Sequence, residues 1–221
     1  MTTRQTFDRD LQRIQENILS LGSMVEGALI DAVQVLHRRD QAGSHRLIEW
    51  DRRVNDKRFV IENDTLTVIA RQQPVARDMR VLAAALEIVT ELERIGDYAK
   101  GIARINLSLR DGFPHEPYMG TLLEMGQTAS LMVHDALAAF AWRDVVLARQ
   151  VPAQDDIVDA GYKETQRQLI QYIMQRPEDM DCANSLLWAA HNLERAADRA
   201  VNICERVIFT VTGEIVEFSE G

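Results

Sequence analysis

Hydrophobic side chains recur at steps of three and four residues along most of the chain, the spacing that places them on one face of an α-helix. The few glycines and prolines fall mainly between these periodic segments. The pattern therefore predicts an all-α protein. The predicted helices cover residues 7–39, 45–72, 77–110, 118–142, 145–175 and 178–210. The last ten residues lack helical spacing, and we expect them to be extended.

The second half of the chain repeats the first. Asp51-x-x-Val54 returns as Asp155-x-x-Val158, 104 positions later, and Arg39-Asp40 returns at the same offset. A cluster of Gly and Pro residues at 111–117 separates the copies, which favours a boundary between residues 1–112 and 113–221. Three amphipathic helices with short connections pack as an antiparallel bundle. The sequence thus predicts two tandem three-helix bundles, six long antiparallel helices related by pseudo-symmetry.

Charge and composition limit the function. The formal net charge is −9, which argues against nucleic-acid binding because that depends on Lys and Arg. The longest stretch without charged residues has 12 residues, 182–193, whereas a membrane span needs roughly 20. No secretory h-region is present, and two cysteines are too few for a disulfide framework. We expect a cytoplasmic protein with reduced thiols that meets a membrane only peripherally, through partners.

One motif occurs in both halves and carries the candidate chemistry. Leu-Glu-Arg-x-x-Asp stands at 92–97 and again at 193–198. Its acids, Glu93 with Asp97 and Glu194 with Asp198, lie one helical turn apart beside the apolar stripe. Paired carboxylates at a half-buried edge suit a hard cation with oxygen ligands. A duplicated structural network of ion pairs, using the adjacent arginines, explains the spacing nearly as well.

Longer stretches around these motifs match a known family. They are Gln73-Pro74-Val75-Ala76-Arg77-Asp78-Met79-Arg80 with 92–97 in the first half, and Asp155-Asp156-Ile157-Val158-Asp159 with 192–198 and Asn202-Ile203-Cys204-Glu205 in the second. On these residues the chain resembles the PhoU family of accessory proteins in phosphate uptake and phosphate signalling. The resemblance covers all but about six residues at the start and ten at the end.

This resemblance implies a regulator and not an enzyme. It implies an adaptor between the ATPase subunit of a phosphate ABC transporter and a phosphate-sensing histidine kinase, holding the starvation response off when phosphate is plentiful. We expect a homodimer for such a protein. The resemblance also implies bound multivalent metal (iron, manganese, magnesium or zinc) and no organic cofactor. The metal ligands it assigns are Glu93, Asp97, Glu194 and Asp198, to which Asp51 and Asp155 are added.

Two alternatives and one departure accompany this reading. The same carboxylates would also serve a metal buffer or a metal-dependent enzyme, although no base, nucleophile or phosphate-binding loop is evident. A helical scaffold without a ligand is the other alternative. The departure lies in the first half, which has Gly101 and Arg104 where the second has Asn202 and Glu205. The metal site of the first half is therefore the weaker of the two.

Overall fold

The computed structural model describes residues 3–218, and helices account for most of them. The long helices are α1 (Thr3–Arg38), α2 (Gln41–Gln72), α3 (Arg77–Ser108), α4 (Glu116–Trp142), α6 (Asp155–Gln175) and α7 (Met180–Thr212). Three short elements complete the chain: α5 (Val145–Gln150) and the 3₁₀ turns η1 (Val151–Gln154) and η2 (Pro177–Asp179). The described residues contain no strand, so the prediction of an all-α fold with six long helices is confirmed.

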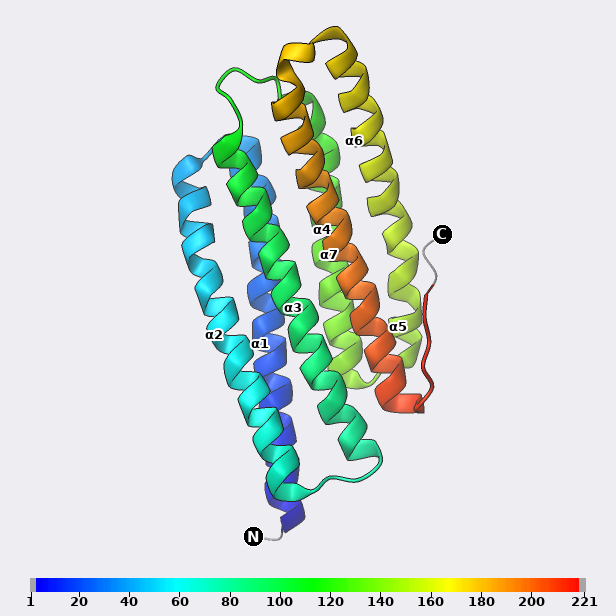
Figure 1. The fold of residues 1–221 in the computed structure, drawn as a ribbon. Coiled ribbons are helices and arrows are strands. Elements are labelled where there is room, and N and C mark those ends of the chain that lie inside the picture. The colour runs from blue at the N-terminus through cyan, green and yellow to red at the C-terminus, as the bar shows by residue number, and fades with distance from the viewer. Residues whose placement is uncertain (1–2, 219–221) are drawn as a thin grey trace.

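The six long helices lie side by side (Figure 1). Helices α3 and α7 pack against each other in front, α1 and α4 pack against each other behind them, and α2 and α6 flank this group of four. Each half keeps its three-helix set, and a single hydrophobic cluster runs through both. A boundary near residue 112 agrees with the loop between α3 and α4 but stays a prediction.

The contact between α1 and α4 preserves the repeat. Gly22 on α1 lies against Leu137 of α4, and Gly126 on α4 lies against Val33 of α1. Both glycines and both partners are 104 positions apart, so each half supplies a glycine and a branched aliphatic residue at the same two positions of the repeat. A side chain on either glycine would collide with a buried neighbour. The contact between the two inner helices therefore follows the pseudo-symmetry predicted from the sequence.

Two of the differences between the observed and the predicted helix boundaries have a clear local cause. Helix α2 begins at Gln41 rather than His45, because the Asp40 carboxylate accepts a hydrogen bond from the Gly43 amide (2.8 Å) and caps the helix. The segment 145–175 is not one helix. It is divided by the η1 turn around Pro152, whose missing N–H and ring disfavour an uninterrupted α-helix there. The break moves Asp155 to the first turn of a separate helix.

One helix needs comment because of its composition. Residues Gln5–Arg38 are long and apolar enough to cross a membrane, although no charge-free stretch of that length exists. Ile18, Leu21 and Val25 on this helix are fully buried against its neighbours. A core helix meets the same criteria, so the composition is explained by packing. Both cysteines are free, as expected.

Candidate metal centre

In the first half, Glu93 faces α2 and meets an arginine there. Arg58 places Nη1 3.1 Å from Glu93 Oε2 and Nε 2.8 Å from Glu62 Oε1. All three side chains are at most 25% exposed, so salt and water screen their interactions less than those of an exposed pair. The hydrogen bond to Glu62 and the charge of Glu93 raise the pKa of Arg58. One of the predicted metal ligands is thus already paired with a permanent cation.

A lysine occupies the space between the other two acids of this half. Lys100 Nζ lies 2.7 Å from Asp51 Oδ2 and 2.5 Å from Asp97 Oδ1, which ties α2 to α3. Burial by itself would lower the pKa of Lys100, but hydrogen bonds to both carboxylates outweigh it and raise the pKa. The ammonium therefore stands where a metal between Asp51 and Asp97 would stand.

The second half brings its acids together around a hollow instead. The cavity has a volume of about 280 Å³ and opens between the start of α6 and the middle of α7. It is lined by Pro152, Asp155, Asp156, Asp159, Lys163, Glu194, Asp198, Arg199, Val201, Asn202 and Phe218. Three of the six predicted ligands, Asp155, Glu194 and Asp198, line this one hollow. The remaining three belong to the ion pairs of the first half.

Glu194 is the most perturbed acid of the hollow. Burial, and then the negative charges of Asp198, Asp159 and Asp155, raise its pKa to about 7, against an opposing effect of Arg195. His191 Nδ1 lies 3.1 Å from Glu194 Oε2. However, burial followed by the charge of Arg195 lowers the pKa of His191. Both shifts disfavour the charged forms, so this contact is a weak ion pair at neutral pH, and Glu194 has no strong counter-charge.

Two substitutions between the repeats explain the contrast. Arg58 corresponds to Tyr162 at the offset of 104, and Lys100 corresponds to Val201 at the offset of 101 that aligns the two motifs. The second half thus lacks these two cations. Two ion pairs of its own acids each stay within one helix, Arg195 with Asp198 at 3.2 Å and Lys163 with Asp159 at 3.5 Å. Sequence reasoning missed Arg58 and Lys100, although a position-by-position comparison of the repeats contains the signal.

The departure noted in the sequence has a different basis. A Cβ at Gly101 would come 2.9 Å from Nδ2 of the Asn192 side chain of α7, so a residue other than glycine would make Asn192 shift. Arg104 is exposed and has no part in the site. Lys100 and Arg58 therefore fill the predicted metal site of the first half. Gly101 and Arg104, the two positions that differ from the second half, do not block it.

Other charges join the two halves directly. Glu91 on α3 accepts hydrogen bonds from Arg199 Nη1 and Asn202 Nδ2 of α7, both at 3.3 Å. The arginines inside the repeated motif pair within their own helices, Arg94 with Glu91 at 3.1 Å and Arg195 with Asp198 at 3.2 Å. Asn202 and Arg199 also line the hollow, so the same two side chains contact both the hollow and α3.

The same fold and repeat occur in known proteins. The family model described as "PhoU domain" matches residues 18–105 and again 122–207. The chain belongs to the PhoU family. A phosphate-specific transport system accessory protein from Edwardsiella tarda is 34% identical over 96% of this chain and 87% of its own length. One from Escherichia coli (strain K12) is also 34% identical, over 94% of this chain and 86% of its own.

Solved PhoU structures agree with the architecture. The phosphate transport system regulatory protein from Streptococcus pneumoniae superposes with a TM-score of 0.89 at 28% identity, covering 96% of this chain and 100% of that one. PhoU from Pseudomonas aeruginosa gives 0.88 at 33% identity, covering 94% and 100%. Relatives are thus named as accessory and regulatory proteins, which supports a phosphate-transport regulator and not an enzyme.

The donor set of the second half fits a hard cation in kind. Its oxygens come from two helices and surround one hollow, and Glu194 is half-buried with a raised pKa. Among residues 3–218, no three His, Cys, Asp or Glu side chains already stand close enough to hold one ion. Side chains around the hollow would therefore have to rotate on binding. The first half does not fit, because its acids are already paired with Arg58 and Lys100.

Proposed function

We propose that this chain acts as a cytoplasmic, homodimeric regulator of phosphate uptake and of the phosphate-starvation response. It connects the ATPase subunit of a phosphate ABC transporter with a phosphate-sensing histidine kinase and keeps the response repressed when phosphate is plentiful. The observation that carries the proposal is the match of both halves to the PhoU domain, in a chain whose relatives are phosphate-specific transport accessory proteins.

The two halves divide the work within this proposal. In the first, Lys100 joins α2 to α3 through Asp51 and Asp97, so this connection is permanent. In the second, Asp155 on α6 and Glu194 with Asp198 on α7 would hold a metal ion, in a hollow whose lining has five acids and only two cations, Lys163 and Arg199. Metal then sets how firmly α6 is held on α7, and with it the shape that the second half presents to a partner.

The polar contacts around the hollow provide a route to the first half. Arg199 and Asn202 lie on the wall of the hollow and also bind Glu91 of α3. Neutralising Asp198 and Glu194 with a cation changes the field at Arg199, and hence its share in the contact with Glu91. The proposed adaptor therefore couples the state of its acidic hollow to the packing of α3 on α7.

Alkaline-phosphatase output in phosphate-rich medium tests the function. A strain lacking the gene carries the intact gene, the variant with Glu194→Gln and Asp198→Asn, or the control Glu124→Gln, which changes an exposed acid on α4. We expect high output in the deletion and low output with the intact gene and the control. The double variant should repress poorly at normal protein level. Low output in the deletion strain itself would refute the regulatory role.

A metal buffer is the second candidate, favoured by the acidic hollow alone. It predicts a different result in the same strains. Output would stay low in the deletion, while sensitivity of growth to excess manganese or iron would rise and be restored by the intact gene and not by the double variant.

A further inference from the structure

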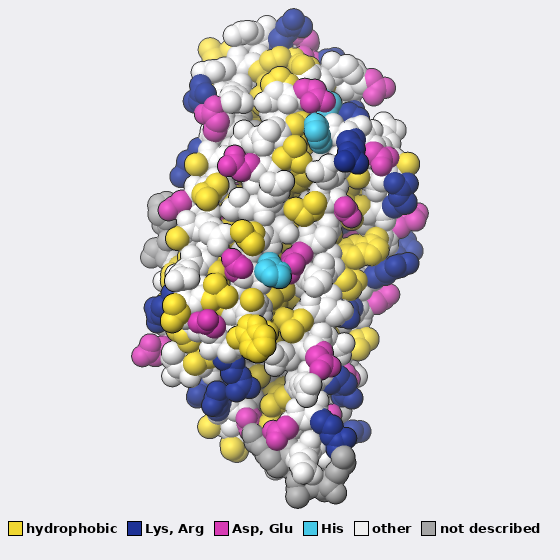
Figure 2. Space-filling view, turned by 180° about the vertical axis from the view of Figure 1, so that it is seen from behind, with side chains coloured by type: hydrophobic (Ala, Val, Ile, Leu, Met, Phe, Trp, Pro, Cys, Tyr) yellow, Lys and Arg dark blue, Asp and Glu magenta, His cyan; other side chains and the backbone are white. Residues whose placement is uncertain are grey.

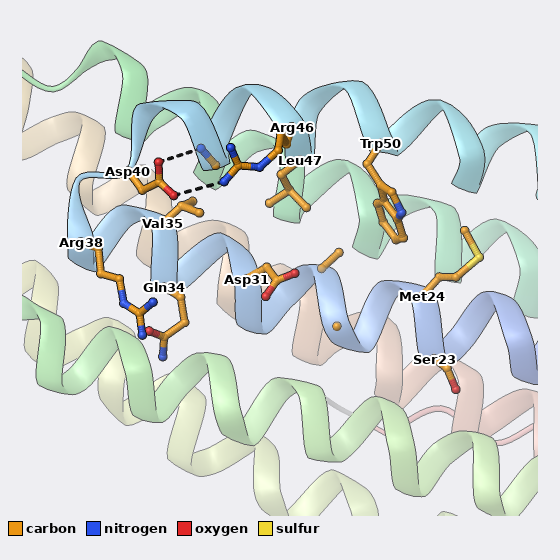
Figure 3. Close-up of a pocket in the computed structure, with 13 residues that line it drawn as sticks. Ser23, Met24, Asp31, Gln34, Val35, Arg38, Asp40, Arg46, Leu47 and Trp50 are labelled. Atoms are coloured by element: carbon orange, nitrogen blue, oxygen red, sulfur yellow. Dashed lines mark hydrogen bonds and ion pairs between the residues drawn. The ribbon is translucent and has the colours of Figure 1, made fainter.

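A second cavity lies away from the acidic hollow, between α1 and α2. It has a volume of about 540 Å³, within the range of about 300–1,000 Å³ typical of ligand pockets. Its lining from α1 runs from Ser23 to Arg38, which is about 22 Å of helix at 1.5 Å per residue. Figure 3 shows this groove with α2 above α1. Its length suits a segment of polypeptide better than a compact metabolite.

The middle of the groove combines an aromatic wall with an unpaired acid. Trp50 reaches from α2 toward α1, and Asp31 lies on α1 opposite Leu47, with Trp50 further along the groove (Figure 3). Asp31 is exposed and has no hydrogen bond or ion pair with any described residue. At Gly27 a Cβ would meet nothing within 4 Å, so the floor of the groove is open one turn before Asp31.

The two arginines that line the groove, Arg38 and Arg46, do not pair with Asp31. Arg46 lies 3.5 Å from Asp40 at the start of α2 and is balanced by it. Arg38 is directed away from α2 in Figure 3. The surface seen from behind carries mixed charges, with hydrophobic side chains gathered along its middle (Figure 2). Around Asp31 and Trp50 the local chemistry is therefore anionic and aromatic, in a chain of net charge −9 that attracts basic partners.

The corresponding region of the second half differs from this groove at two positions. At the offset of 104, Gly27 is replaced by Leu131 and Trp50 by Gln154, while Asp31 is kept as Asp135. Gln154 Nε2 donates to Asp135 Oδ2 at 3.2 Å, so the acid that is unpaired in the first half is satisfied internally in the second. The contrast between the halves is thus the reverse of that at the predicted metal ligands. Here the acid of the first half is open to a ligand, and that of the second is closed off by its hydrogen bond.

We propose that the groove between α1 and α2 binds an arginine side chain carried by a protein partner. The guanidinium would pair with the Asp31 carboxylate and stack on the Trp50 indole, the two interactions in which arginine exceeds lysine. The rest of the partner segment would lie along the groove on Met24, Ala28 and Leu47. This deepens the proposed adaptor role by naming the chemistry of one partner, and its test does not depend on phosphate signalling.

The indole N–H signals of Trp50, Trp142 and Trp188 in ¹⁵N-labelled protein report on the groove, the last two serving as internal controls. Three probes are titrated: a helical peptide with one central arginine, the same peptide with citrulline, and free L-arginine. We expect a saturable shift of the Trp50 signal with the arginine peptide, and binding at least about tenfold weaker with citrulline, which lacks the charge. Free arginine should bind more weakly than the peptide.

Two variants complete the test. Asp31→Asn should weaken the arginine peptide about tenfold or more, whereas Asp135→Asn in the closed half should leave it unchanged. Gly27→Leu fills the groove with the residue that the second half already carries, at a helical position with open space, and should abolish the shift. Equal binding of the citrulline peptide, tighter binding of free arginine, or an undiminished shift in Gly27→Leu would each overturn the proposal.

Discussion

Replacing Lys100 with methionine removes the cation that holds Asp51 and Asp97 together while keeping a similar side-chain length. Asp51 is 9% exposed and Lys100 is 18% exposed, so the variant leaves a nearly buried carboxylate with the Asn55 amide as a hydrogen-bond donor and without its cation. Removing one member of a buried pair costs about 3–5 kcal/mol. The exposure of Asp97, 47%, makes its contact worth less, and we expect a net loss of about 2–4 kcal/mol in the free energy of unfolding.

Urea unfolding followed by circular dichroism measures this loss, and thermal unfolding gives a second reading. At about 2–4 °C per kcal/mol for a chain of this length, Tm should fall by about 4–16 °C. Lys57→Met is the matched control, because Lys57 makes only an exposed contact with Ser20, and it should change stability by less than about 0.5 kcal/mol.

A double variant separates the ion pair from the packing of the lysine stem. Asp51→Asn combined with Lys100→Met removes the uncompensated charge, so it should recover about 1–3 kcal/mol relative to the sum of the single changes. If Lys100→Met costs less than the Lys57 control, the first half does not depend on its lysine, and the contrast drawn between the halves is incorrect.

Three further predictions follow from the same geometry. With metal chelated, Glu194→Gln should raise Tm at pH 8 and leave it unchanged at pH 4. The pKa of Glu194 is raised from 4.5 to about 7 in the folded state, so the intact protein loses stability as pH rises through that interval. A higher Tm of the variant at both pH values would contradict this. Iodoacetamide should label Cys182 in the folded protein and spare Cys204, since burial raises the pKa of the Cys204 thiol to about 12; mass spectrometry of peptides shows whether both react. Arg58→Tyr with Lys100→Val, which copies the second half into the first, should add manganese-binding capacity measured by equilibrium dialysis, and unchanged stoichiometry would count against the comparison of the repeats.

Much of the fold follows from local sequence patterns. Six periodic stretches, the breaker cluster at 111–117 and the repeat at an offset of 104 predict the helices and their pseudo-symmetry. The start of α2 was misplaced because the Asp40 cap outweighs the weak helix propensity of Gly43 and Ser44. The break at Pro152 was missed because apolar spacing continues across it.

The site was harder to predict than the helices. Spacing along one helix places the Glu and the Asp of the motif one turn apart in both halves. It does not show which side chain the neighbouring helix supplies. Arg58 and Lys100 decide that the first site is filled, and both act across the α2–α3 contact. Likewise the groove beside Asp31 arises from the absence of a side chain at Gly27, which no motif marks. Comparing the repeats residue by residue gives part of this information without a structure.

Manganese stoichiometry of the untagged protein tests most directly whether the hollow of the second half, and not the charge network of the first, is the metal site. Equilibrium dialysis with elemental analysis compares the intact chain, the variant with Glu194→Gln and Asp198→Asn, and the variant with Glu93→Gln and Asp97→Asn. We predict binding by the intact chain, loss in the first variant and retention in the second. No uptake by the intact chain, or uptake that survives the change of Glu194 and Asp198, would contradict this assignment.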